Sequence, residues 1–137
     1  MVFRLIVMDI NRIEFDTIEF KKIIKDAPTD IIIFNRKADY YCLKIDGKIV
    51  SISGVIKHKN GYKIISCFTY PEFRNNHYSS KLINHIINFY KADYYYCNAN
   101  ENSYHVFERF GFCQISFTQY KNFTRRVMIL DRCNHKK

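Results

Sequence analysis

Two stretches of the sequence combine residue types that could bind a ligand. The first, PEFRNNHYSSKLI at residues 71–83, places an arginine, two asparagines, a histidine and two serines between a strand-like run and an amphipathic helix-like run. The N–H groups in the first turn of a helix have no partner within the helix, so a polar helix start of this kind can bind an anion. We therefore predict a phosphate-binding turn at residues 74–80. The alternative is a solvated helix start with an ordinary N-cap.

The second stretch, NANENSYHVFERFGF at residues 98–112, reads as a short helix that Gly111 closes. Tyr104 could present a hydroxyl group, although a tyrosine at helical spacing is also a common packing residue. Asn98 and Asn100 could contact a ligand, or they could simply be turn residues. No acidic residue lies on the strand-like run YKIISCFTY, so the sequence names no general base.

The bulk composition limits the class of protein. The chain has 137 residues, of which 47% are hydrophobic, and no apolar run approaches the ~20 residues that a membrane span needs. We predict one globular domain over residues 1–137, cytoplasmic and without a membrane partner. The formal net charge of +9 favours polyanionic partners. The chain is also rich in Ile, Asn, Tyr, Phe and Lys, the composition expected from an AT-rich genome, which would supply lysine whatever the partner. The charge is therefore weak evidence of a nucleic-acid partner.

The cysteines and histidines predict neither disulfides nor a metal site. Five cysteines are an odd number, and none of them forms a CxxC pair. The five histidines are scattered among different predicted elements, whereas zinc needs clustered ligands. We expect reduced thiols that pack in the core and take no part in the chemistry: Cys42, Cys67, Cys97, Cys113 and Cys133.

Turn signals predict a three-stranded antiparallel meander in the middle of the chain. Asp46-Gly47 and Asn60-Gly61 each separate alternating apolar runs, and both dipeptides fit type I′ turns with positive φ. The three strands are DYYCLKI, KIVSISGVIKH and YKIISCFTY. Before them, the first apolar run, MVFRLIVMDINRIEF, predicts a strand.

Two further segments precede the meander. Apolar residues at spacings near three and four predict one helix, or two short ones, within RIEFDTIEFKKIIKD and ending before Pro28. The residues that set this spacing are Ile13, Ile18, Phe20, Ile23 and Ile24. The next segment, TDIIIFNRK at residues 29–37, is interpreted as a loop with a short helical turn.

After the meander the pattern alternates between helix and strand. One helical face carries Tyr78, Leu82, Ile83, Ile86, Ile87 and Tyr90. The strand DYYYCNA follows, then the short helix NSYHVFERFG, then the strands FCQISFTQY and RRVMILD. Residues 62–97 form a β-α-β unit with parallel strands. The order β-α-β-β-β-α-β-α-β-β predicts an α/β fold with a mixed, mainly antiparallel central sheet and helices on both faces.

The two polar stretches resemble signature motifs of the GCN5-related N-acetyltransferase (GNAT) family. SCFTYPEFRNNHYSSKLI is similar to a family strand that runs into the pattern Arg/Gln-x-x-Gly-x-Gly/Ala at a helix start, and NANENSYHVFERFGF is similar to a later Asn-helix-Gly-Phe motif. The resemblance covers roughly residues 38–130. It implies a divergent member with a GNAT-like fold, a single acyl-CoA N-acyltransferase-like domain, and acetyl-CoA or coenzyme A as cofactor.

The resemblance also implies roles for individual residues. A backbone amide on the strand, at Phe68 or Thr69, would polarise the thioester carbonyl where this strand diverges from YYYCNA, and Asn100 would contact the pantetheine arm. The pyrophosphate would lie over the turn. The turn consists of Arg74, Asn75, Asn76, His77, Tyr78, Ser79 and Ser80.

The sequence departs from the family pattern at three positions. His77 and Ser79 replace small residues, and of the bulkier residues a histidine is one that tolerates left-handed backbone well. Phe107 lies at the thiol end of the cofactor site, where the family commonly has a tyrosine that protonates the departing thiolate, and phenylalanine has no proton to donate. Tyr104 could take this catalytic role, or the thiolate, with a pKa near ~8.5, could leave unaided.

Taken together, the motifs predict transfer of an acetyl or related acyl group from coenzyme A to an amine by direct attack. The acceptor could be a small molecule, a protein or a nucleobase, and the protein could be a monomer or a homodimer. Two alternatives stay open. The chain could be a degenerate GNAT-fold binding protein. It could also be a nucleic-acid-modifying enzyme of viral type, because the basic segment YKNFTRRVMILDR would suit binding to a polyanion.

Overall fold

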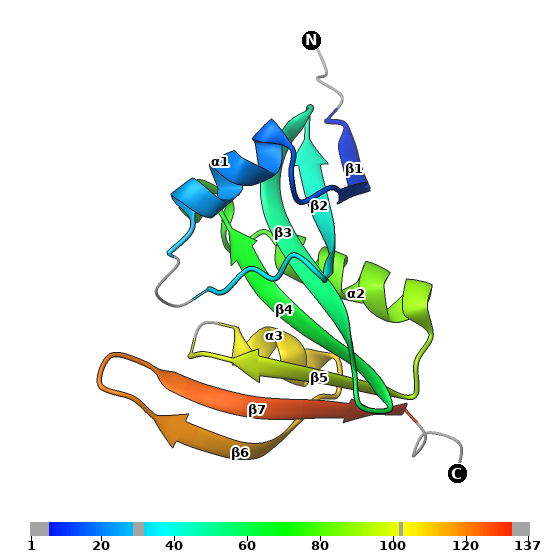
Figure 1. The fold of residues 1–137 in the computed structure, drawn as a ribbon, viewed down its shortest axis with the longest axis vertical. Coiled ribbons are helices and arrows are strands. Elements are labelled where there is room, and N and C mark those ends of the chain that lie inside the picture. The colour runs from blue at the N-terminus through cyan, green and yellow to red at the C-terminus, as the bar shows by residue number, and fades with distance from the viewer. Residues whose placement is uncertain (1–5, 29–31, 102, 133–137) are drawn as a thin grey trace, which may run out of the picture.

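The computed structural model describes residues 6–28, 32–101 and 103–132, which build one seven-stranded sheet with three α-helices (Figure 1). The elements are β1 (Met8–Ile13), α1 (Ile18–Asp26), β2 (Asp39–Ile45), β3 (Lys48–His58), β4 (Gly61–Thr69), a 3-10 turn (Pro71–Phe73), α2 (Tyr78–Tyr90), β5 (Tyr94–Ala99), α3 (Tyr104–Arg109), β6 (Cys113–Gln119) and β7 (Thr124–Asp131). This order confirms the prediction. None of the described helices is long and apolar enough to cross a membrane.

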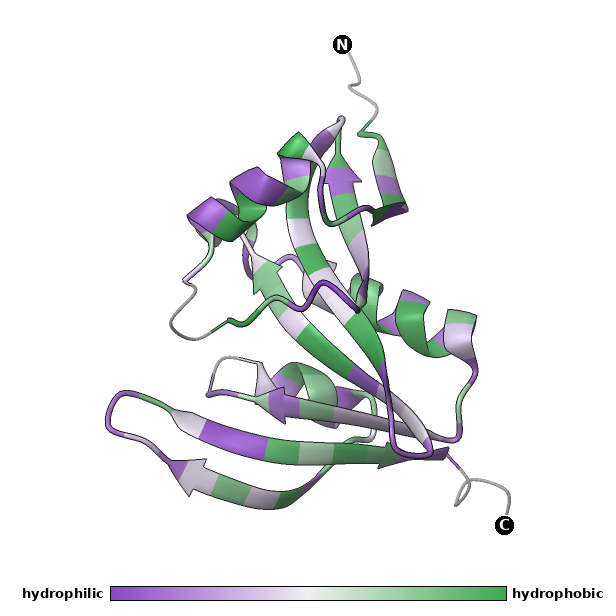
Figure 2. Ribbon diagram, in the orientation of Figure 1, coloured by the Kyte–Doolittle hydropathy of each residue, from purple (hydrophilic) through white to green (hydrophobic). Residues whose placement is uncertain are grey.

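The strands lie in the order β1-β2-β3-β4-β5-β7-β6, and only the β4–β5 pair is parallel. The prediction of a mixed, mainly antiparallel sheet is therefore confirmed. Helix α1 covers one face, whereas α2 and α3 pack on the other (Figure 1). Each face has its own apolar cluster, which agrees with the predicted helices on both faces. Figure 2 shows the alternation of apolar and polar residues on α1, whose apolar side supplies Phe20 and Ile23 to its cluster.

One helix, not two, precedes the meander. The side chain of Thr17 caps α1 by accepting a hydrogen bond from the N–H of Phe20 (3.2 Å), and the helix ends before Pro28 as predicted. Including Ile13 in the helical pattern was wrong, because Ile13 ends β1 and pairs with Tyr40 of β2. Its side chain still packs in the same apolar cluster as α1, which explains the helix-like spacing.

The two hairpin turns differ. At the β2–β3 turn, Asp46 and Gly47 both have positive φ (50° and 81°), as a type I′ turn requires. At the β3–β4 turn, the prediction was wrong by one residue: Lys59 has the positive φ (50°), and Gly61 already belongs to β4. Gly61 is needed for a different reason, because a Cβ atom there would lie 2.0 Å from the carbonyl oxygen of Tyr94 in β5.

Two helix ends frame the later part of the chain. Helix α2 buries Leu82, Ile83, Ile86 and Ile87 against the sheet. Helix α3 ends in a Schellman motif, in which Gly111 (φ 95°) and Phe112 donate to the carbonyl groups of Glu108 and Phe107. Of the segment at 29–37, residues 29–31 lie outside the described residues, residues 32–35 have no regular structure, and a turn follows at 36–37.

Candidate functional site

A cavity lies where β4 and β5 stop pairing. The two parallel strands are paired only over Tyr62–Ile64 and Tyr95–Cys97. Beyond these residues, a cavity of about 400 Å³ is lined by both strands, the start of α3, the β6–β7 hairpin and residues before β2. Diverging strands leave backbone N–H and C=O groups without a cross-strand partner. This cavity therefore combines enclosed space with polar backbone.

A β-bulge shapes the β4 side of the cavity. Ser66 has a left-handed backbone (φ 54°), and the pairing of β3 with β4 shifts between Ile52 and Gly54. The Ser66 hydroxyl donates to the carbonyl of Ile33 (2.5 Å) and lies 3.1 Å from the Tyr40 hydroxyl. The bulge thus ties the irregular segment before β2 to the cavity wall.

The neighbouring β4 side chains are held by the fold. Phe68 is buried in the apolar cluster of α1, and the Thr69 hydroxyl lies 2.8 Å from the Ser51 hydroxyl. The thiol of Cys67 lines the cavity, 3.2 Å from the hydroxyl of the buried Ser53. Burial raises the pKa of this thiol to about 11, so it is neutral at physiological pH. Phe68 and Thr69 lie just beyond the β4 residues that line the cavity.

The polar turn before α2 exposes a row of backbone donors. Asn75 and His77 both have left-handed backbones (φ 66° and 62°). Among the residues that the structure describes, none accepts a hydrogen bond from the backbone N–H groups of residues 75–80, and no side chain caps α2. Arg74 donates from Nε to the carbonyl of Thr69 (3.1 Å), which anchors the turn to the end of β4. Successive N–H groups without an acceptor can bind an anion.

The start of α3 forms another part of the wall. Asn100 and Ser103 exchange two hydrogen bonds: the Ser103 N–H donates to Asn100 Oδ1 (2.9 Å), and the Asn100 N–H donates to Ser103 Oγ (3.1 Å). Both residues line the cavity, as does Phe107, which is 2% exposed and packs edge-on against Phe112. Tyr104 does not line the cavity. Its ring lies under the guanidinium of Arg126, 4.2 Å away.

Of the predicted site residues, the cavity itself gathers Asn98, Asn100 and Phe107. The polar turn at residues 74–80 lies at the end of β4, outside the cavity wall. Sequence reasoning missed several lining residues, among them Ser66, Ser103 and Arg125. The aromatic and basic residues of YKNFTRR could have indicated that the β6–β7 hairpin contributes to a site. The bulge at Ser66 has no recognisable sequence pattern. Within the described part of the chain, no three His, Cys, Asp or Glu residues are grouped to hold a metal ion.

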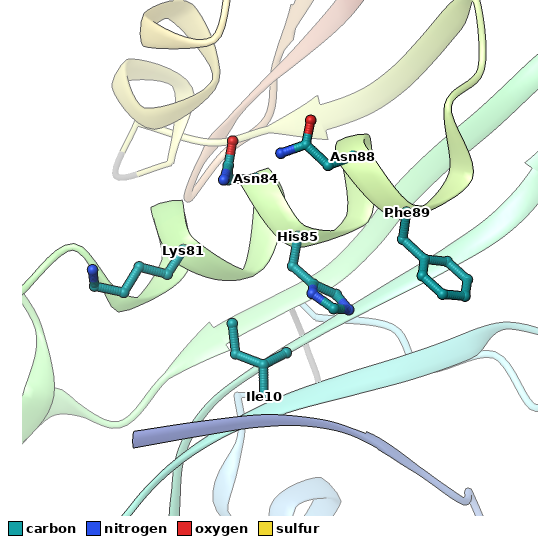
Figure 3. A pocket seen from close by; sticks show the side chains of 6 residues that line it. All are labelled: Ile10, Lys81, Asn84, His85, Asn88 and Phe89. Atoms are coloured by element: carbon teal, nitrogen blue, oxygen red, sulfur yellow. The ribbon is translucent and has the colours of Figure 1, made fainter. Parts of the chain in front are cut away.

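A second hollow, of about 510 Å³, lies between α2 and β1 (Figure 3). His85 and Phe89 stack with ring centroids 6.0 Å apart, and both extend from the side of α2 that faces β1. Asn84 and Asn88 extend from the other side of the helix, so no polar groups converge on one point (Figure 3). The cavity between β4 and β5 is the stronger candidate for chemistry.

Comparison with known proteins gives the fold a precedent. Residues 7–112 match the family model described as Acetyltransferase (GNAT) family, and no curated protein matches. The structure is similar to an IAA acetyltransferase from Bacillus cereus (TM-score 0.73, 11% identity, 91% of this chain and 99% of that chain). It is also similar to an acetyltransferase of the GNAT family from Streptococcus pneumoniae (TM-score 0.74, 12% identity, 91% and 99%). A third similar structure is N-acetylglutamate synthase from Neisseria gonorrhoeae complexed with coenzyme A and L-arginine (TM-score 0.66, 14% identity, 90% and 33%). At these identities, the likeness to solved structures shows the fold.

Proposed function

Because the chain belongs to the acetyltransferase (GNAT) family, we propose that it transfers an acetyl or related acyl group from coenzyme A to an amine. The observation that carries this proposal is the junction of β4 and β5. Pairing of the two strands ends after three residue pairs, and a cavity of about 400 Å³ follows beside the bulge at Ser66. A thioester placed there would meet backbone donors that need no side-chain rearrangement.

The described residues fit coenzyme A at two places. The turn at residues 74–80 offers backbone N–H groups without a described acceptor, next to the cation of Arg74, which suits a pyrophosphate. The cavity wall at Asn100 and Phe107 offers a polar turn and an apolar ring, which suit a pantetheine arm. Both places lie at the end of β4 from which α2 begins, so one extended ligand would run between them.

In this proposal the protein orients the amine and polarises the thioester carbonyl, and it forms no covalent intermediate. When bound, the acyl thioester supplies the electrophilic carbonyl carbon. Backbone N–H groups of residues 66–69 on β4 would polarise the carbonyl oxygen, and the cavity wall would hold the amine beside the carbonyl carbon. The new C–N bond would replace the C–S bond, with coenzyme A leaving as the thiolate. The neutral thiol of Cys67 takes no part as a nucleophile, because the reactive form of a cysteine is the thiolate.

The experiment that tests this proposal is reversal of the charge at Arg74. Isothermal titration with coenzyme A should show that Arg74→Glu weakens binding by a factor of about 10 to 100, the equivalent of a lost charge-assisted hydrogen bond. Lys57→Glu is the matched control, since Lys57 is exposed on β3 and lies outside both the turn and the cavity wall. If the two variants bind coenzyme A with equal affinity, the pyrophosphate does not lie at the turn. If the unmodified protein does not bind coenzyme A, the proposed cofactor is wrong.

A second candidate function is binding of coenzyme A without catalysis. Phe107 favours it, because this phenylalanine stands where the family commonly has a proton donor, and the hydroxyl of the neighbouring Tyr104 does not line the cavity. The two functions differ in one measurement. Release of free thiol from acetyl-CoA that requires both the protein and an amine, and that is matched by formation of the acylated amine, occurs only if the protein is a transferase.

A further inference from the structure

The charged residues of the cavity are all cations. Of the lining residues that the structure describes, two carry a charge at neutral pH, Lys63 on β4 and Arg125 on β7. Glu101 reaches the wall only indirectly, through the hydroxyl of Thr124, 3.1 Å from its Oε1. A cationic acceptor entering this cavity would therefore meet two like charges and no lining carboxylate.

These two cations lie on the face of the sheet opposite α2 and α3. Tyr62 and Ile64 pack into the apolar cluster that contains α2, so strand alternation directs Lys63 to the other face. Arg126 lies over Tyr104 of α3, so alternation likewise directs Arg125 to the other face. Lys63 and Arg125 thus lie on the face opposite α2 and α3, whose N-terminal ends are proposed to bind coenzyme A. The two cations remain available to the acceptor.

The same end of the cavity has an aromatic wall. Tyr120 and Phe123 of the β6–β7 hairpin stack with ring centroids 4.7 Å apart and planes inclined by 17°. The Arg125 guanidinium lies 5.7 Å from the centre of the Tyr120 ring, which fixes this cation beside the rings. Ile32 and Ile33 add apolar surface to the lining. A flat or apolar body bearing a negative charge matches this set of groups.

We infer that the acceptor is a small amine that also carries an anionic group, a carboxylate or a phosphate, which Arg125 and Lys63 bind. This inference rests on the proposed acyl transfer and names the substrate class for it. The positive surroundings disfavour the ammonium form of the acceptor and so lower the pKa of its amine. The neutral amine is the nucleophile, so the cations would assist attack in a cavity whose described lining contains no Asp, Glu or His.

Matched benzylamines test the inference, because they share one amine and differ in the group at the opposite end of the ring. The probes are para-(aminomethyl)benzoate, the corresponding phosphonate, para-(aminomethyl)benzamide, whose para group is uncharged, and para-xylylenediamine, whose para group is a second cation. Binding is measured by ligand-observed NMR, with and without coenzyme A. We expect an anionic probe to bind about 10-fold more tightly than the benzamide, as one charge-assisted contact predicts, and the diamine to bind most weakly. The ratio of carboxylate to phosphonate affinity distinguishes the two kinds of anion.

Variants assign the preference to these residues. Arg125→Gln and Lys63→Gln should each reduce the preference for the anionic probes over the benzamide, and Lys57→Gln should leave this preference unchanged. Equal binding of all probes, or tightest binding of the diamine, overturns the inference. Titration of coenzyme A alone keeps the two hypotheses apart. A protein that binds coenzyme A but shows no anion preference refutes only the acceptor class, whereas a protein that does not bind coenzyme A refutes the proposed function.

Discussion

Phe107 is the residue at which this chain departs most clearly from its family in chemical terms. Its ring is 2% exposed, packs against Phe112 at 5.1 Å, and touches the cavity. A hydroxyl added to such a ring has two possible environments. In the cavity it gains room and a partner, whereas in the dry core it loses its hydrogen bonds to water, at a cost of about 1 to 3 kcal/mol.

We predict that Phe107→Tyr keeps the melting temperature of the protein and leaves acetyl-CoA-dependent turnover equal or higher. The reason is that Phe107 lines the cavity, so the new hydroxyl enters it and can protonate the departing thiolate. Thermal unfolding and thiol release are measured on the same preparation. Phe112→Tyr is the control, because Phe112 packs on the same ring but does not line the cavity. A lower melting temperature without a gain in turnover would place Phe107 away from the thiol.

A second prediction at the residue scale concerns the reactivity of Cys67. Its pKa is raised from 9.0 to about 11 by burial, so the thiol is protonated at neutral pH and becomes a thiolate only as the pH rises through that range. Iodoacetamide should therefore alkylate the exposed Cys113 before Cys67 at neutral pH, and labelling of Cys67 should accelerate as the pH approaches 11. Peptide mass spectrometry follows both sites at once. An acylated Cys67 that turns over with the reaction would show covalent catalysis instead.

Single residues were only partly predictable from the sequence. The tolerance of histidine for left-handed backbone anticipated His77 (φ 62°), because this preference is local. Ser66 and Arg125 reach the cavity through a bulge and through the distant pairing of β7 with β5, and neither cause is local. The roles of Arg74, Asn100 and Tyr104 stay predictions.

At the scale of elements, α2 is bounded at both ends by residues with left-handed backbone. His77 (φ 62°) precedes the helix and Lys91 (φ 53°) follows it. For residues other than glycine, this conformation costs roughly 1 to 2 kcal/mol, somewhat less for histidine and asparagine. The pair provides an internal control, because only His77 belongs to the polar turn.

We predict that His77→Gly and Lys91→Gly each raise the free energy of unfolding by up to about 1 kcal/mol, since glycine adopts the required angles without strain. Only His77→Gly should also change the affinity for coenzyme A, and it should strengthen binding because the imidazole no longer adds bulk beside the N–H groups. Urea unfolding and calorimetric titration measure the two effects. If both variants alter cofactor affinity equally, the turn has no special part in binding.

Most elements could be predicted because their signals are short-range: the Asp46-Gly47 turn, the helical spacing from Tyr78 to Tyr90, and the closing Gly111. The misplaced features have long-range causes. Glycine at position 61 predicts a turn, but glycine is needed there because the backbone of Tyr94 in β5 approaches it closely. Ile13 fits a helical pattern, but its pairing with β2 makes it a strand residue.

At the scale of the whole molecule, the sheet consists of two parts joined by a short parallel seam. The first part contains β1–β4 and the second β5–β7, and three residue pairs connect them. Helix α2 supports the seam from one face, where its buried residues share an apolar cluster with Tyr95 and Met128. Few backbone hydrogen bonds therefore hold the two parts together around the cavity.

We predict that coenzyme A stabilises this seam. At a ligand concentration 100 times Kd, linkage gives about 2.7 kcal/mol, which corresponds to a rise in melting temperature of about 5 to 15 °C for a chain of this size. Hydrogen exchange should slow at residues 65–69 and 98–100, where β4 and β5 have no mutual pairing, and should change little at residues 40–43 of β2. Protection spread evenly over the sheet would indicate general stabilisation without a ligand at the seam.

The turn at residues 74–80 can tolerate substitution during evolution. Its N–H groups belong to the main chain, and every amino acid except proline has one, so residue types can change while the N–H groups remain. A position that favours glycine accepts His77 because histidine reaches the same angles. Substitution of side chains in this turn therefore need not change its backbone shape.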